Sequence, residues 1–278
     1  MTYQHTPVPP EIKHLDRPNG RVAYDIQGSG PLVLLVPGMG DLRSTYRFLT
    51  PILVAAGYTV ATTDLRGHGD SDPSFTSYGD ADTASDILAL LAELGRPAVV
   101  AGNSMAAGAA VIAAAHRPDL ISGLVLVGPF VREPASNSAW RRAFLRLLMA
   151  RPWAAAAWQA YLPKLYAGKQ PVDFADYRRG VIASLRRPGY TRAFSLTTRT
   201  DHVQAGASLE SLDVPALVLM GEMDPDFPDP TAEATWIAAA LHGRAMMVPD
   251  AGHYPQSQQP AVVASAVLGF LMEVTDHS

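Results

Sequence analysis

Ser104 lies where an apolar segment changes directly into an alanine-rich helical segment. Pro97-Ala98-Val99-Val100 precedes it, and the stretch from Ala106 to Ala115 follows. A strand that ends in Gly-Asn-Ser-Met-Ala and continues at once as a helix makes a sharp elbow, which lifts the serine hydroxyl above the sheet and points a helix N-terminus at it. The junction therefore predicts a serine presented as a nucleophile at the end of a strand.

Two further strand ends downstream carry side chains that such a serine needs. Asp224 follows the apolar strand predicted at 216–220, and His253 follows a second short strand predicted at 245–248. Imidazole titrates near neutrality, so His253 is the candidate base for Ser104, and Asp224 is the candidate partner for its other ring nitrogen.

The same proline-rich loop contains two rivals to Asp224. Asp226 and Asp229 are the rival acids, and a turn-capping role is the other interpretation of any aspartate here. Asp224 lies closest to the end of the predicted strand, which favours it as the acid.

The chain order Ser, Asp, His, together with two upstream motifs, resembles the α/β-hydrolase family over nearly the whole chain. Leu34-Leu35-Val36-Pro37-Gly38-Met39-Gly40 is similar to the family's first oxyanion loop, and Asp64-Leu65-Arg66-Gly67-His68-Gly69-Asp70-Ser71-Asp72 to the loop after its next strand. One departure is Pro37-Gly38, where the family often has His-Gly. The resemblance implies a catalytic triad of Ser104, Asp224 and His253, an oxyanion hole made by the backbone N–H groups of Met39 and Met105, and a mechanism without metal or organic cofactor.

The reaction remains open among several chemistries on this fold. A carboxylic ester hydrolase acting through an acyl-enzyme intermediate is the first expectation. Gly102-Asn103-Ser104-Met105 is also similar to the elbow of meta-cleavage carbon–carbon bond hydrolases, although Ala106-Ala107 stands where those enzymes usually have Gly-Gly. The fold is also compatible with a non-hydrolytic cofactor-free enzyme and with a small-molecule receptor, because fold does not fix function.

Strand and helix signals alternate, which predicts a mostly parallel sheet with helices on both faces. Strands are predicted at 22–26, 32–36, 58–62, 98–100, 124–127, 216–220 and 245–248, and helices at 46–56, 81–94, 105–116, 231–241 and 261–274. The alternation stops after Gly128-Pro129 and resumes near Val214. We therefore expect an α/β core formed by 1–128 and 211–278, with a helical cap inserted at 129–210.

Aromatic and aliphatic side chains of this cap are expected to give a largely apolar pocket for a small-molecule substrate, with at least half of them packing within the cap itself. They are Trp140, Trp153, Trp158, Tyr161, Leu162, Leu165 and Tyr166. His68 and His202 are near enough to reach the cleft, but a loop-stabilising role is expected for both.

The amino-acid composition argues against several classes of site and function. The 278 residues contain no cysteine, which excludes disulfides, thiolate metal sites and cysteine nucleophiles, and a net charge of −4 gives no reason to expect nucleic-acid binding. The N-terminus lacks the pattern of a secretory signal and no apolar helix reaches the ~20 residues that a membrane span needs, so a cytoplasmic location is expected. The oligomeric state is left open.

Overall fold

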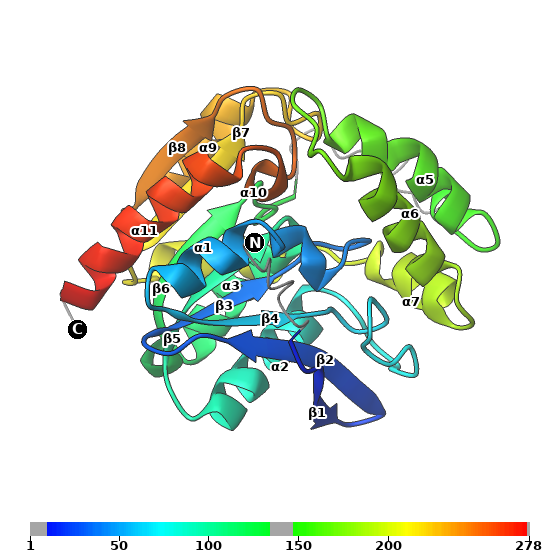
Figure 1. Cartoon of the computed structure of the whole chain (residues 1–278), viewed down its shortest axis with the longest axis horizontal. Helices are drawn as coiled ribbons and strands as arrows, with labels where there is room; N and C mark the ends of the chain where they lie inside the picture. Colours follow the sequence, from blue (N-terminus) through cyan, green and yellow to red (C-terminus); the bar gives the residue numbers. More distant parts are fainter. Residues whose placement is uncertain (1–9, 134–146, 277–278) are drawn as a thin grey trace, which may run out of the picture.

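The computed structural model describes residues 10–133 and 147–276, and they form an eight-stranded sheet covered by helices (Figure 1). The strand order is β1-β2-β4-β3-β5-β6-β7-β8. β1 and β2 pair antiparallel, β2 pairs antiparallel with β4, and all the other neighbours are parallel. The strands are β1 Lys13–Arg17, β2 Gly20–Gln27, β3 Leu32–Val36, β4 Thr59–Thr63, β5 Ala98–Asn103, β6 Ile121–Val127, β7 Ala216–Gly221 and β8 Arg244–Val248. The predicted α/β class is confirmed.

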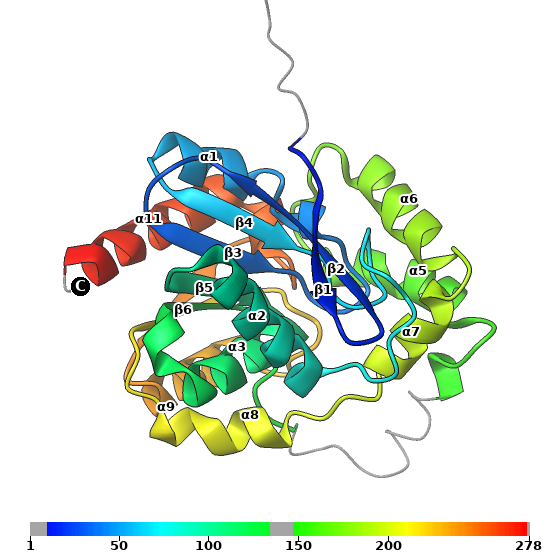
Figure 2. The same cartoon turned by 90° about the horizontal axis from the view of Figure 1, so that it is seen from below.

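Helices cover both faces of this sheet (Figure 2). One layer contains α1 Leu49–Ala55 and α11 Pro260–Asp276, and the other contains α2 Asp80–Leu94, α3 Met105–His116, α8 Val203–Ser208 and α9 Pro230–Ala240. Side chains alternate along β3, so Leu34 and Val36 enter one core while Val33 and Leu35 enter the other. Burial on both faces explains why this strand is apolar throughout.

β1 and α1 differ from the sequence expectation, for local reasons, and a short helix, α10 Pro255–Gln258, was not predicted. β1 was not predicted because Leu15 is its only buried side chain; Asn19-Gly20, with Asn19 at φ 70°, turns it into a hairpin with β2. The helix expected from Tyr46 begins instead at Leu49, just before Pro51, after a short 3₁₀ turn at Arg43–Tyr46. Proline is favoured in the first helical turn, where its missing N–H has no partner to lose.

Helices also occur in the described part of the connection between β6 and β7, where the cap was expected. They include α5 Ala154–Leu165, α6 Phe174–Leu185 and α7 Tyr190–Thr197, which lie together beside the sheet (Figure 1). Buried side chains of all three share one apolar cluster with Tyr254 of the core. α8 is different, since its Ala205 belongs to the main core beside α3. The domain limits at 129 and 210 stay a prediction.

A buried ion network fixes the loops that leave β3 and β4. Arg43 pairs through Nε with Asp25 at 2.9 Å and through Nη1 with both Asp64 and Asp70. The Asp64 side chain is fully buried, and its other contacts are the backbone N–H groups of Arg43 and Asp70. Gly69, at φ 50°, allows the approach, because a Cβ there would lie 2.1 Å from the Asp64 carboxylate. In the described part of the chain, no helix is long and apolar enough to cross a membrane.

Removing the cation of this network should destabilise the fold strongly. Arg43→Met leaves the buried Asp64 carboxylate without its counter-charge, and we expect the free energy of unfolding to fall by about 3–5 kcal/mol. Urea denaturation followed by circular dichroism measures this change. Arg117→Met is the control, since its partner Asp119 and Arg117 itself are both more than half exposed, and it should leave stability essentially unchanged. Equal stability of the two variants would contradict the assigned role of Arg43.

Candidate active site

Ser104 occupies the tight junction between β5 and α3. Its backbone has φ 59° and ψ −125°, a conformation that a residue with a side chain adopts only under constraint. The Ser104 N–H donates to the carbonyl of Val127 at 2.9 Å, which ties the junction to the end of β6. Ser104 is 7% exposed and directly precedes the first turn of α3. Sequence and structure thus agree on a strained elbow, and the role of nucleophile stays a proposal.

The structure brings Asp224 and His253 together from the ends of β7 and β8. Oδ2 of Asp224 lies 2.7 Å from Nδ1 of His253, and both side chains are almost fully buried. The backbone N–H of Asp226 donates to Oδ1 of Asp224 at 3.0 Å, so each carboxylate oxygen has a donor. No hydrogen bond joins Ser104 to His253, although both residues are described.

The two rival aspartates have other partners. Asp226 Oδ2 is 3.8 Å from Nδ1 of His253, and its Oδ1 accepts from the hydroxyl of Tyr161. Asp229 is the N-cap of α9, where its side chain accepts from the N–H of Ala232 at 2.9 Å. The geometry therefore favours Asp224 as the partner of His253.

The environment of His253 shifts its proton affinity. Burial alone disfavours the charged ring, but the carboxylate of Asp224, supported by those of Asp226 and Asp41, outweighs it and raises the pKa of His253 to about 9. Asp224, Asp226 and His253 are also the described residues whose ligand atoms group closely enough to hold a metal ion. The hydrogen bond between Asp224 and His253 already explains that grouping.

The loop after β3 passes directly beside the serine. A Cβ on Gly38 would lie 2.8 Å from Cβ of Ser104, so only glycine permits this approach. The backbone N–H groups of Met39 and Met105, predicted to form the oxyanion hole, donate to no other group among the described residues. They are therefore available as donors close to Ser104.

His68 stabilises this loop through a hydrogen bond from the N–H of Gly40. Its Nδ1 lies 2.9 Å from the carbonyl of Arg66 and its Nε2 lies 2.9 Å from the N–H of Gly40, so the assigned tautomer carries its proton on Nδ1. Burial lowers the pKa of His68 to about 4, which keeps the ring neutral and able to accept from Gly40. The loop-stabilising role expected for His68 agrees with this geometry, and its target, Gly40, is new from the structure.

Trp158 and Tyr177 hold the same loop from the cap. The indole N–H of Trp158 donates to the carbonyl of Gly40 at 2.8 Å, and the hydroxyl of Tyr177 donates to Asp41. Burial raises the pKa of Asp41 to about 6, although its bonds to Tyr177 and to the N–H of Leu42 oppose this change. The cap and the loop are thus connected by specific hydrogen bonds that the sequence alone did not indicate.

Asn103 is a further residue that sequence reasoning did not assign to the site. Its side-chain amide donates to the carbonyl of Val127 at 3.0 Å and to that of His253 at 3.2 Å. It therefore links the elbow, the end of β6 and the histidine loop. Its position next to Ser104 was a signal, but the partners became visible only in three dimensions.

The seven residues expected in the cap lie in different surroundings. Four of the seven are buried in the cluster shared with Tyr254, namely Trp158, Leu162, Leu165 and Tyr166. Tyr161 packs at its margin, whereas Trp153 is 47% exposed and donates to the carbonyl of Leu147. Trp140 lies outside the described residues.

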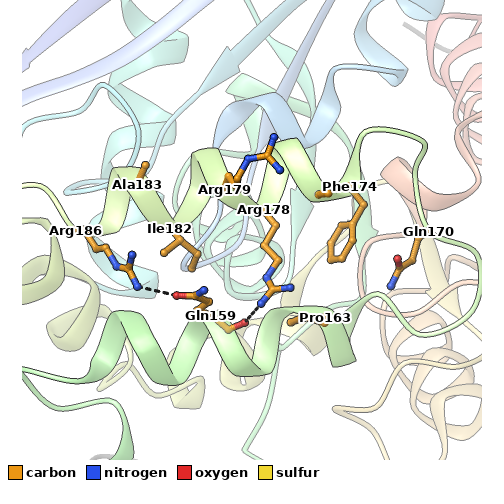
Figure 3. Close-up of a pocket in the computed structure, with 10 residues that line it drawn as sticks. Gln159, Pro163, Gln170, Phe174, Arg178, Arg179, Ile182, Ala183 and Arg186 are labelled. Atoms are coloured by element: carbon orange, nitrogen blue, oxygen red, sulfur yellow. Dashed lines mark hydrogen bonds between the residues drawn. The ribbon is translucent and has the colours of Figure 1, made fainter.

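A separate hollow of about 690 Å³ lies between α5 and α6 (Figure 3). In Figure 3, Arg178 and Arg186 reach from α6 toward Gln159 on α5, to which each donates a hydrogen bond. The other lining residues are Pro163, Gln170, Phe174, Ala175, Arg179, Ile182 and Ala183. None of them belongs to the site predicted around Ser104.

Comparison with known proteins agrees with the fold. The sequence profile described as "Alpha/beta hydrolase family" matches residues 33–266. The chain belongs to this family. A 2-(acetamidomethylene)succinate hydrolase of Mesorhizobium japonicum is 26% identical to this hydrolase-family chain, over 91% of the chain and 92% of the relative.

Two more proteins extend this comparison. An sn-1-specific diacylglycerol lipase of Mus musculus is 27% identical, over 87% of the chain and 81% of the lipase. The crystal structure of a putative lipase from Acinetobacter baumannii has a TM-score of 0.80 at 20% identity, covering 97% of this chain and 93% of the other. The family membership suggested by the motifs is confirmed.

The proton affinity of His253 tests the assignment of its acid. Asp224→Asn removes the nearest negative charge, so the pKa of His253 should fall from about 9 toward or below the ordinary histidine range. Asp226→Asn removes a more distant charge and should lower it less. Imidazole NMR signals followed against pH give both values, with the His253 signal identified by its loss in His253→Gln. A larger shift in Asp226→Asn would make Asp226 the acid.

Proposed function

We propose that this protein is a serine hydrolase that cleaves a small carboxylic ester through an acyl-enzyme intermediate. The observation that carries the proposal is the buried Asp224–His253 pair at the same sheet edge as Ser104, whose backbone is held in the left-handed region. The family membership and the relatives named as hydrolases support hydrolysis in general.

Each step uses a group of this chain. His253 takes the proton of Ser104 as Oγ attacks the carbonyl carbon, and Asp224 stabilises the resulting imidazolium. The N–H groups of Met39 and Met105 donate to the oxyanion, an effect worth about 3 kcal/mol for each donor. His253 then gives its proton to the leaving alkoxide, and a water molecule repeats the sequence to release the acid and restore Ser104.

An ester is the favoured substrate over the other chemistries on this fold. The relative named as an sn-1-specific diacylglycerol lipase supports an ester. A panel of esters, lactones, thioesters and one meta-cleavage diketone separates these chemistries. Turnover of the diketone alone would favour carbon–carbon bond hydrolysis, and binding without any turnover would favour a receptor.

The nucleophile is tested by removing its oxygen. Ser104→Ala should lower kcat for every accepted ester by at least about 10⁴-fold, because loss of the nucleophile approaches the loss of the whole triad. The thermal midpoint of unfolding shows that the variant is folded. Near wild-type turnover by the folded variant would mean that Ser104 is not the nucleophile.

The proposed role of Trp158 in positioning the oxyanion loop is tested by a matched pair of tryptophan variants. Trp158→Phe keeps the ring but removes the bond to the carbonyl of Gly40, and we expect kcat to fall about three- to tenfold as the loop loosens. Trp153→Phe also removes an indole bond to a backbone carbonyl, that of Leu147, at an exposed position. Its kcat should be unchanged. Equal effects of the two substitutions would show that Trp158 does not position the loop.

A further inference from the structure

A second histidine–carboxylate pair lies beside Phe130, whose ring also neighbours that of His253. Nδ1 of His202 is 2.8 Å from Oδ2 of Asp80, and the two residues are only 7% and 4% exposed. Asp80 begins α2 and His202 immediately precedes α8, whose first turn lies toward the cap side of the sheet (Figure 2). The triad does not use either residue.

Contacts of Phe130 and Gly108 place the Asp80–His202 pair near Ser104. The N–H of Phe130 donates to the carbonyl of Ser104 at 3.3 Å, so Phe130 lies next to the elbow. Its ring stacks on His202, with centroids 5.6 Å apart and planes at 26°, and lies 5.8 Å from the ring of His253. Gly108, one turn after Ser104 on α3, makes room for Asp80, whose Oδ2 would be 2.8 Å from a Cβ at that position. The ring of Phe130 is therefore a neighbour of both imidazoles.

The hydrogen bonds of Asp80 indicate that Nδ1 of His202 carries a proton. The hydroxyl of Thr200 accepts from the N–H of Asp80 and therefore donates its own hydrogen to Oδ1. Oδ2 receives the Nδ1–H of His202, so the carboxylate accepts at both oxygens. A neutral imidazole bound in this way has its lone pair on Nε2.

Nε2 of His202 is the unused atom of the pair. Within residues 10–133 and 147–276 it makes no hydrogen bond. The stacking on Phe130 and the bond to Asp80 fix the ring, so Nε2 is held in place before any ligand arrives. Such a preorganised acceptor loses little entropy on binding.

We propose that His202, oriented by Asp80, binds a hydrogen-bond donor of the substrate, an amide N–H or a hydroxyl located away from the scissile carbonyl. This inference rests on the proposed ester hydrolysis at Ser104 and deepens it. The substrate is thereby an ester that is largely apolar but carries one donor group, which contacts Nε2 while the neighbouring carbon atoms pack on Phe130. His202 acts as a specificity-determining residue and takes no part in bond cleavage.

Isosteric pairs of esters test this assignment. Methyl N-acetyl-β-alaninate and methyl 5-oxohexanoate differ only by N–H in place of CH₂ in the acyl chain. The esters 2-acetamidoethyl butanoate and 4-oxopentyl butanoate make the same exchange on the alcohol side, and longer homologues of both pairs vary the reach. In at least one pair the wild-type kcat/KM should favour the N–H member at least about tenfold, because Nε2 is left unpaired with the other.

Substitution of His202 should remove that preference without harming the chemistry. His202→Phe keeps the aromatic stack but lacks the acceptor, so the ratio of kcat/KM should fall to about one while the CH₂ ester keeps a rate within about threefold of wild type. His116→Phe, at the far end of α3, is the matched control and should retain the wild-type ratio. An unchanged ratio in His202→Phe, or no preference in any wild-type pair, overturns the proposal.

Binding to Ser104→Ala separates this proposal from that of the reaction. In calorimetric titrations the N–H ester should bind this variant more tightly than its CH₂ partner, and its addition should shift the imidazole NMR signal of His202, identified by its loss in His202→Gln. If the wild type hydrolyses no ester but these binding differences appear, the proposal of ester hydrolysis is contradicted and the proposed binding role of His202 is supported. If both esters bind alike and leave the signal unmoved, the binding site fails whatever the turnover.

Discussion

The close crossing of backbone at Ser104 is the constraint on which the rest of the site depends. The left-handed conformation of Ser104 corresponds to a strain of about 1–3 kcal/mol, which surrounding contacts must hold. Two glycines make this possible, because a Cβ on Gly102 would meet the carbonyl of Ala106 at 2.4 Å and one on Gly38 would meet Ser104 itself. The elbow, the loop after β3 and the first turn of α3 thus pack closely together because glycine has no side chain.

Three buried titratable groups around this crossing have different states for identifiable reasons. His253 has its pKa raised by carboxylates, whereas His68, whose neighbours are backbone groups, has its pKa lowered by burial. Asp64 is fully buried but lies against Arg43. Burial nevertheless raises the pKa of Asp64, so the balance between burial and neighbouring charges decides which form is favoured. The same rule explains how one histidine is suited to exchange protons and another to hold a loop.

The sequence predicted the parts of the site that follow strands, and missed those that act from other elements. Ser104, Asp224 and His253 each follow a strand, so parallel pairing brings them to one edge, and the strand limits of β3 and the helix limits of α3 were predicted correctly. The bonds of Trp158 and Tyr177 to the oxyanion loop join positions more than 100 residues apart. The Asp80–His202 pair spans a similar separation. No periodicity or local spacing encodes such contacts, and they require the folded chain.

The central claim, that Ser104 is a nucleophile activated by His253, is tested most directly by covalent labelling. A fluorophosphonate reacts by attack of the serine oxygen on phosphorus with loss of fluoride, and the base accepts the proton. Peptide mass spectrometry should locate the phosphonyl group on Ser104, with a labelling rate that rises with pH as His253 loses its proton and that falls sharply in His253→Gln. Labelling at another residue, or labelling of Ser104 at the same rate in His253→Gln, would contradict the account.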